Sequence, residues 1–225
     1  MSLRSQVKRM FLGPPGERPR DVKHGLLNGC RFNINTSSKS MRLIGFDERE
    51  IAEHVRIHSA KAATAFDIGA NDGWYSVYFA TRANMKKVFA FDGSAQCLTR
   101  LSANMTLNQP AIQAQVEVVN KMVGDRNDGD FVTVDSFADQ IIYPCVLKVD
   151  VDGGEMDVFN GAGKVLAHQD VSVILETHSV ELERDCRALL EKAGYRCQIV
   201  DIGWYRKMFP EARVIAHNRW MIASR

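Results

Sequence analysis

The stretch "FDIGANDGWYSVYFA" combines residue types that bind ligands at the edge of a sheet. An apolar run ends in a carboxylate, Asp67, and two glycines follow at Gly69 and Gly73, with Asn71 between them. Glycines let the backbone approach a ligand closely, and the carboxyl ends of parallel strands hold the ligands of α/β proteins. A carboxylate attracts an ammonium group and repels a pyrophosphate. We therefore expect a ligand that is cationic or zwitterionic near this loop.

A second acid, Asp92, ends the next apolar run, 25 residues after Asp67. In dinucleotide-binding folds an acid at this place accepts hydrogen bonds from ribose hydroxyls. The dinucleotide pattern G-x-G-x-x-G needs a glycine where Asp67 stands, so an NAD(P)-dependent oxidoreductase is not favoured. One acid for an amino group and one for a ribose fit S-adenosylmethionine. The alternative is that both acids only cap neighbouring helices.

Candidates for the chemistry on an acceptor follow two later apolar runs. Asp150, Asp152 and Glu155 come after the first of these runs, and Glu176 and His178 come after the second. Methyl transfer needs a nucleophile held about 3 Å from the methyl group, and an alcohol also needs a base. We predict His178 as the base because imidazole titrates near neutrality, with Asp150 as the next candidate. The alternative for His178 is an ordinary histidine of a surface loop.

Metal binding is an open alternative at the same acids. The carboxylates of Asp150, Asp152 and Glu155, with Glu176 nearby, could hold a magnesium ion. Carboxylates at such places also accept hydrogen bonds from loop amides. We favour this second interpretation and expect no metal. His54 and His58 have a spacing that can bind zinc on a helix. No third ligand accompanies these histidines, so we expect them on a solvated helix face.

Alternating strand and helix patterns must position these residues. Strands are predicted at residues 62–68, 87–92, 114–120, 146–151, 171–176, 196–202 and 218–224. Helices are predicted at 47–60 (capped by Asp47), 74–84, 95–108, 155–166 and 180–194, the last one stopped by Gly194. The alternation predicts an α/β fold, a doubly wound, seven-stranded, mostly parallel sheet. The last two strands have no helix between them, so an antiparallel hairpin is expected at the sheet edge.

Composition limits the partners and the compartment. The net charge of +2 gives no indication of a nucleic-acid partner. The one basic stretch, from Arg4 to Lys23, also contains prolines and glycines, so we do not expect it to form a nucleic-acid-binding surface. No window approaches the roughly 20 apolar residues of a membrane span, and no apolar segment follows the basic N-terminus as in a secretory signal. The five cysteines form no C-x-x-C pair, which favours a cytoplasmic protein. Nothing in the sequence indicates an oligomeric state.

Four ordered motifs resemble those of the FkbM-type methyltransferases, a branch of the class I S-adenosylmethionine-dependent family. They are "FDIGANDGWYS", "VFAFDGS", "VTVDSF" and "LKVDVDGGEMDVFNGA", within residues 62–178. The resemblance implies a Rossmann-like sheet of seven strands with a reversed last strand. It also implies cofactor contacts at Asp67, Gly69, Asn71, Gly73 and Asp92. Two departures are Asp92-Gly93 in place of Glu-Pro and Asp152 in place of a glutamate.

The resemblance further implies transfer of a methyl group to a hydroxyl of a sugar or natural product. We expect residues 1–46 to be a partly irregular extension and residues 47–225 to be the methyltransferase domain. The alternative function is a catalytically inactive binding module that keeps the methyltransferase fold. We expect a small-molecule acceptor, and neither a nucleic acid nor a membrane as partner.

Overall fold

The computed structural model describes residues 16–203 and 217–225, and a seven-stranded sheet is at its centre. The strand order is β10-β11-β9-β8-β3-β4-β5, and every neighbouring pair is parallel except the two pairs that β11 makes. The strands are β3 (Thr64–Ile68), β4 (Lys87–Phe91), β5 (Gln115–Val119), β8 (Cys145–Val149), β9 (Val171–Thr177), β10 (Arg196–Val200) and β11 (Arg219–Ser224). The predicted fold class, including the reversed last strand, is confirmed.

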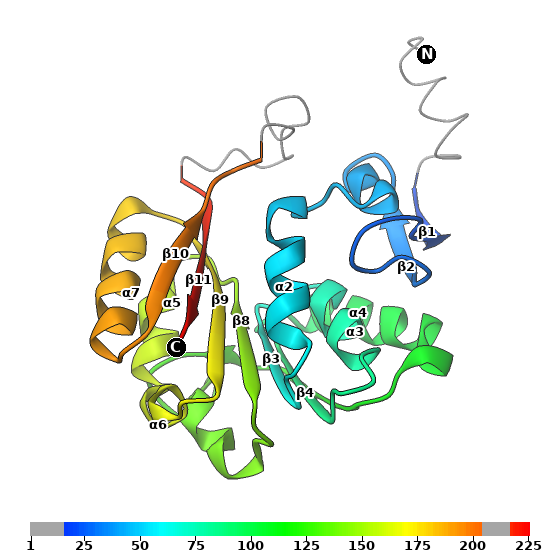
Figure 1. The fold of residues 1–225 in the computed structure, drawn as a ribbon. Helices are drawn as coiled ribbons and strands as arrows, with labels where there is room; N and C mark the ends of the chain where they lie inside the picture. Colours follow the sequence, from blue (N-terminus) through cyan, green and yellow to red (C-terminus); the bar gives the residue numbers. More distant parts are fainter. Residues whose placement is uncertain (1–15, 204–216) are drawn as a thin grey trace.

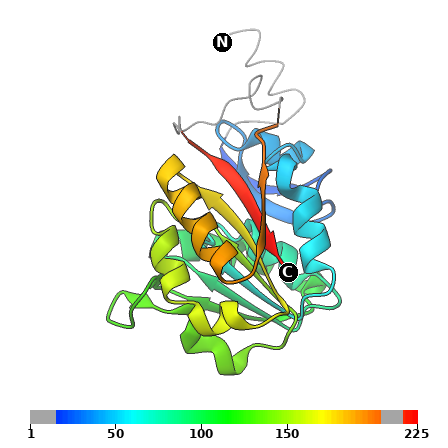
Figure 2. The same cartoon turned by 60° about the vertical axis from the view of Figure 1, so that its left-hand side comes forward.

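Helices cover both faces of this sheet, as a doubly wound fold requires. Figure 1 shows α2, α3 and α4 on one side and α5, α6 and α7 on the other. Both views place β11 between α2 and α7 (Figure 2). The helices are α2 (Ala52–Ser59), α3 (Trp74–Ala80), α4 (Ala95–Leu107), α5 (Glu155–Asn160), α6 (Gly163–Ala167) and α7 (Val180–Lys192). Two apolar cores result, one on each face.

Two helix predictions need correction. The helix predicted over 155–166 is broken between α5 and α6, because the backbone of Ala162 departs from the helical conformation (φ −121°, ψ 14°). Asp47 does not cap α2; its carboxylate accepts a hydrogen bond from Arg42 instead, and a short 3₁₀ helix, η2 (Arg49–Ile51), precedes α2. The predicted stop at Gly194 is confirmed, since this residue has a φ of 91°.

The aromatic residues of α3 pack between the sheet and the N-terminal part of the chain. Trp74, Tyr75, Tyr78 and Phe79 are all buried. Trp74 also contacts Phe32, with ring centroids 4.8 Å apart. Helix α3 is therefore apolar on nearly every side.

Residues 16–46 begin with a hairpin of β1 (Glu17–Asp21) and β2 (Arg31–Asn35), and the 3₁₀ helix η1 (Ser40–Ile44) follows. The side chain of Asn104 in α4 accepts a hydrogen bond from the backbone of Asn33 and donates one to the backbone of Asp72. This hairpin shares its core with α2 and α3. The first part of the basic stretch that runs from Arg4 to Lys23, residues 4–15, lies outside the described residues.

Smaller elements complete the described chain. They are η3 (Gln109–Ala111), β6 (Met122–Val123), β7 (Phe131–Val132) and η4 (Val134–Gln140). Strands β6 and β7 form a separate two-stranded parallel sheet. Across 16–203 and 217–225, no helix has the length and apolar character that crossing a membrane requires.

Candidate functional site

The loop between β3 and α3 owes its shape to three residues with positive φ. Gly69, Asn71 and Gly73 have φ angles of 77°, 49° and 84°. A Cβ atom at Gly69 would lie 1.8 Å from the carbonyl oxygen of Asp150. Only glycine therefore fits at this position, and what approaches its backbone is the end of the neighbouring strand β8.

Asp92 follows β4 and holds this loop in place. One carboxylate oxygen accepts a hydrogen bond from the backbone of Asn71 at 2.9 Å, and the other accepts one from the backbone of Ser94 at 2.8 Å. Asp92, Gly69 and Asn71 also line a cavity of about 790 Å³. A carboxylate has about four lone-pair sites, so Asp92 retains acceptor capacity toward this cavity.

Asp67 lies beneath the loop, and its side chain is fully buried. Ser76 donates a hydrogen bond to one carboxylate oxygen at 2.6 Å, and the Nζ atom of Lys148 is 3.6 Å from the other. Burial raises the pKa of Asp67 above its ordinary value, and the pull of Lys148 and Ser76 opposes this rise. The sequence pattern predicts a ligand ammonium at Asp67, whereas in the structure Lys148 provides the positive charge next to it.

His178 follows β9 and has a fixed orientation on the opposite side of the cavity. Its Nδ1 atom is 2.7 Å from a carboxylate oxygen of Glu155, which is fully buried. A hydrogen bond from Nδ1–H to this carboxylate leaves Nε2 of the neutral ring as an acceptor. The His178 side chain is 11% exposed, so it is not an ordinary surface histidine.

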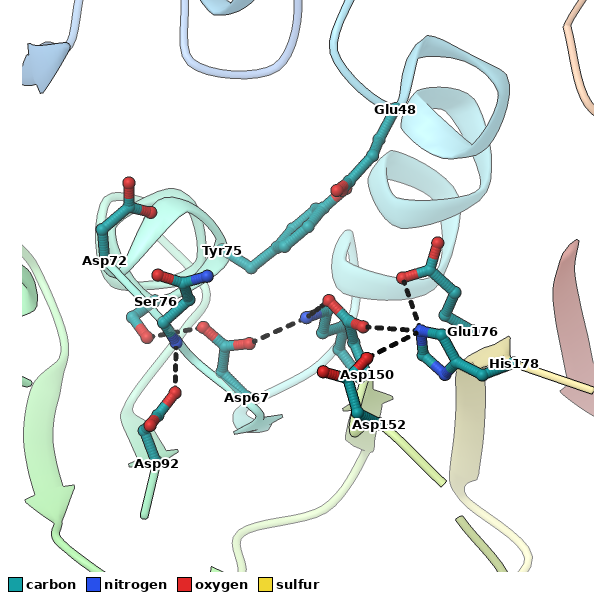
Figure 3. A network of polar contacts seen from close by, with 12 residues as sticks. Glu48, Asp67, Asp72, Tyr75, Ser76, Asp92, Asp150, Asp152, Glu176 and His178 are labelled. Atoms are coloured by element: carbon teal, nitrogen blue, oxygen red, sulfur yellow. Dashed lines mark hydrogen bonds and ion pairs between the residues drawn. The ribbon is translucent and has the colours of Figure 1, made fainter. Parts of the chain in front are cut away.

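Three further acids face Nε2 of His178. Their nearest oxygens lie 3.6 Å away for Asp152, 3.8 Å for Asp150 and 3.9 Å for Glu176 (Figure 3). The hydrogen bond to Glu155 raises the pKa of His178, burial opposes this, and the nearby carboxylates add to the rise. The predicted candidates His178 and Asp150 thus lie together at one end of the cavity.

Asp150 and Glu176 form a coupled pair of acids. Burial and the charge of Asp150 raise the pKa of Glu176. Burial alone would raise the pKa of Asp150 too, but the Lys148 ammonium and hydrogen bonds from Glu176 and Lys148 lower it. At neutral pH Glu176 is therefore the protonated partner, and it donates to the Asp150 carboxylate.

Asp150, Glu176 and His178 each offer a ligand atom, and these atoms lie within 4.8 Å of one another. Within the part of the chain that the structure describes, no other group of three such residues has this geometry, and His54 and His58 belong to none. The Lys148 ammonium is 3.0 Å from Asp150, so a cation already compensates this carboxylate. That these residues bind no metal ion remains a prediction.

The roof of the cavity comes from residues 38–48, which were predicted to form the end of an irregular extension and the start of a helix, with no role in the site. The carboxylate of Asp72, in the glycine loop, accepts hydrogen bonds from Lys39 at 2.7 Å and from Arg42 at 2.7 and 2.8 Å. Glu48 accepts a hydrogen bond from the hydroxyl of Tyr75. Burial and the nearby Asp47 and Asp150 raise the pKa of Glu48 to about 7. No local pattern could reveal these contacts, because the partners lie about 30 residues apart.

Comparison with known proteins supports the assignment made from the motifs. Residues 130–197 match the model of the Methyltransferase FkbM domain. The resemblance to the FkbM methyltransferases is confirmed. The matched segment contains Lys148, Asp150, Glu155, Glu176 and His178, but not the glycine loop. No curated protein matches the sequence.

Solved structures share the fold at low sequence identity. The FkbM methyltransferase of Methylobacillus flagellatus is 13% identical, with a TM-score of 0.57; the match covers 72% of this chain and 44% of that one. This chain thus spans less than half of that relative. An rRNA methylase of Streptococcus thermophilus is 14% identical, with a TM-score of 0.52 and coverage of 79% and 97%.

A third relative is the precorrin-6y C5,15-methyltransferase of Geobacter metallireducens. It is 15% identical, with a TM-score of 0.52 and coverage of 77% of this chain and 89% of that one. At such identities the likeness shows the fold alone, which is that of the class I methyltransferases.

The ion pair between the roof and the glycine loop gives a stability prediction. Arg42→Gln should lower the free energy of unfolding by about 3 kcal/mol, because it removes the guanidinium that donates two hydrogen bonds to the buried Asp72 carboxylate. Urea denaturation followed by circular dichroism measures the loss. The control is Arg56→Gln, which removes an exposed pair with Glu53 and should cost less than about 1 kcal/mol. Equal costs in the two variants would contradict a structural role for the roof contact.

Proposed function

We propose that the protein transfers the methyl group of S-adenosylmethionine to a hydroxyl of a small molecule, such as a sugar or a natural product. One observation carries the proposal: the His178–Glu155 pair presents Nε2 to the same cavity that Gly69, Asn71 and Asp92 line. A volume of about 790 Å³ lies within the usual range of roughly 300–1,000 Å³ for small-molecule sites.

Three of the predicted cofactor residues, Gly69, Asn71 and Asp92, line the cavity in which such a ligand would lie. Asp92 retains lone pairs for ribose hydroxyls, and the backbone at Gly69 and Asn71 forms the adjoining wall. Gly73 and Asp67 support this wall from outside the cavity lining. When bound, S-adenosylmethionine supplies an electrophilic methyl group on a sulfonium.

His178 is the proposed base. Its Nε2 atom takes the proton of the acceptor hydroxyl as the new O–CH₃ bond forms and the S–CH₃ bond breaks, with the bonding electrons left on sulfur. Glu155 then stabilises the imidazolium through Nδ1–H, as in other carboxylate–histidine pairs. Asp150 is the next candidate for the base. If His178 is the base, the Asp150 carboxylate orients the acceptor. No metal is assigned to this mechanism.

The charge of the cavity supports a small-molecule acceptor over a nucleic acid. The carboxylates of Asp150 and Asp152, together with the protonated Glu176, surround Nε2 of the proposed base. Carboxylates repel phosphates, whereas they accept hydrogen bonds from sugar hydroxyls. The intact base and its partner favour an enzyme over an inactive binding module. Five free cysteines support action in the cytoplasm.

Titration with S-adenosylhomocysteine tests the cofactor site. We expect micromolar affinity, about −8 kcal/mol, and a loss of at least about tenfold in Asp92→Ala because a ribose acceptor is removed. The matched control is Ser94→Ala, which removes the cap of α4 on the same turn and leaves the carboxylate. Calorimetry on the two variants separates these effects. Wild-type affinity in Asp92→Ala would remove this residue from the cofactor site.

His178→Ala tests the base. Turnover with an alcohol acceptor found by screening should fall by about a hundredfold or more, while the affinity for S-adenosylhomocysteine stays within about twofold. Normal turnover in this variant would transfer the role to Asp150. Binding of RNA that collapses between about 50 and 200 mM salt would instead indicate a nucleic-acid substrate.

A further inference from the structure

Lys148 is a buried cation beneath the cavity; it lies in the motif "LKVDVDGGEMDVFNGA", and the proposed mechanism gives it no role. Its side chain is 2% exposed. The Nζ atom lies 3.0 Å from Asp150 and 3.6 Å from Asp67, and it also stands 5.0 Å from the centre of the Tyr75 ring. An ammonium group leaves water only where carboxylates compensate it. These two acids therefore account for its burial.

The sheet itself holds Lys148 in this position. Lys148 in β8 is the register partner of Asp67 in β3, so the two side chains leave the sheet on the same face. Asp150 comes two residues later, and its carbonyl lies directly against the site of Gly69. The register of two central strands thus determines which carboxylates the ammonium can contact.

At Asp67, Lys148 occupies the place that a ligand ammonium would take. The other oxygen of Asp67 accepts the hydroxyl of Ser76, and the side chain does not line the cavity. The oxygen on the Lys148 side, Oδ1, accepts no hydrogen bond among the described residues, and the Lys148 ammonium at 3.6 Å is its counter-charge. Because this carboxylate lies outside the cavity lining and is already paired with a cation, a bound ligand would contact it only by displacing Lys148.

At Asp150, Lys148 takes the oxygen that faces away from the base. Its Nζ atom contacts Oδ2, whereas Oδ1 lies 3.8 Å from Nε2 of His178. The groups that face His178 are Glu155 at Nδ1 and Asp150, Asp152 and Glu176 at Nε2. Glu176 is the protonated one of the four, so the carboxylates of Glu155, Asp150 and Asp152 act on the imidazole, and Lys148 provides a nearby positive charge that limits their combined effect.

We propose that Lys148 is a positioning residue that joins the glycine loop to the base: it neutralises Asp67 through an ion pair and holds Asp150 with Oδ1 toward His178. The inference rests on the proposed function, in which His178 takes the acceptor proton. Asp67 then acts on the ligand only through Lys148 and the loop. Both consequences are measurable without knowledge of the acceptor.

The first test compares S-adenosylhomocysteine with an analogue that has hydrogen in place of the α-amino group. Loss of the amino group should weaken binding by the same factor, within about twofold, in the wild type and in Asp67→Asn. If the effect of the amino group disappears in Asp67→Asn, Asp67 binds the ligand ammonium and the proposal is wrong. Should Asp67→Asn not fold, Asp67→Asn/Lys148→Met provides a charge-balanced replacement.

The second test follows the imidazole of His178 by NMR titration. The pKa of His178 should rise by about one pH unit in Lys148→Met, because the carboxylates then act without a nearby cation. Lys87→Met is the control: it removes a lysine that contacts Glu117 and Gln140 and should leave this titration unchanged. A folded Lys148→Met protein, or the charge-balanced double variant, with the wild-type pKa at His178 would overturn the proposal. Failure of the proposed function would appear separately, as no binding of S-adenosylhomocysteine.

Discussion

The ion pairs of Lys148 with Asp67 and Asp150 connect the sheet to everything built at its carboxyl edge. Burying one ammonium between two carboxylates is stable only while the geometry is maintained, because a lone buried charge is strongly destabilising. Asp67 lies at the end of β3 and Asp150 just after β8. Lys148 therefore fixes the relative positions of the glycine loop and of the segment that faces His178.

A second set of charges fixes the roof to the same loop. Asp72 projects from the glycine loop and binds both Lys39 and Arg42. The guanidinium of Arg42 also lies 4.6 Å from the centre of the Trp74 ring. The loop thus has Lys148 on its sheet side and Arg42 on its roof side. These contacts on opposite sides keep the glycine loop in one conformation before any ligand binds. Binding is then favoured, because little conformational entropy of the loop is lost.

The pattern of apolar and polar residues was sufficient to predict the sheet and the edge of the sheet at which the site lies. Apolar runs such as those before Asp67, Asp92 and Asp150 identify central parallel strands, because such strands are buried on both faces. Polar residues directly after these runs must then meet at one edge. His178 and Asp150 were brought together in this way, and the structure places them at one end of the cavity.

Partner choice within the site could not be predicted from the same patterns. Lys148 is one polar residue inside an apolar strand, and only the register with Asp67 shows which charge it meets. Glu155 was recognised as an acid near the site, but its hydrogen bond to Nδ1 of His178 depends on the packing of α5 against α7. Strand β1 escaped prediction because its residues "ERPRD" are mostly exposed, and its pairing with β2 determines its conformation.

The central claim is that one cavity holds the cofactor beside Asp92 while Lys148 remains paired with Asp67 and Asp150. A crystal structure of the complex with S-adenosylhomocysteine tests it most directly. The account predicts ribose hydroxyls within hydrogen-bond distance of Asp92, the ligand sulfur on the side of His178, and Lys148 still in contact with both carboxylates. A ligand ammonium bound to Asp67, with Lys148 displaced, would contradict the account.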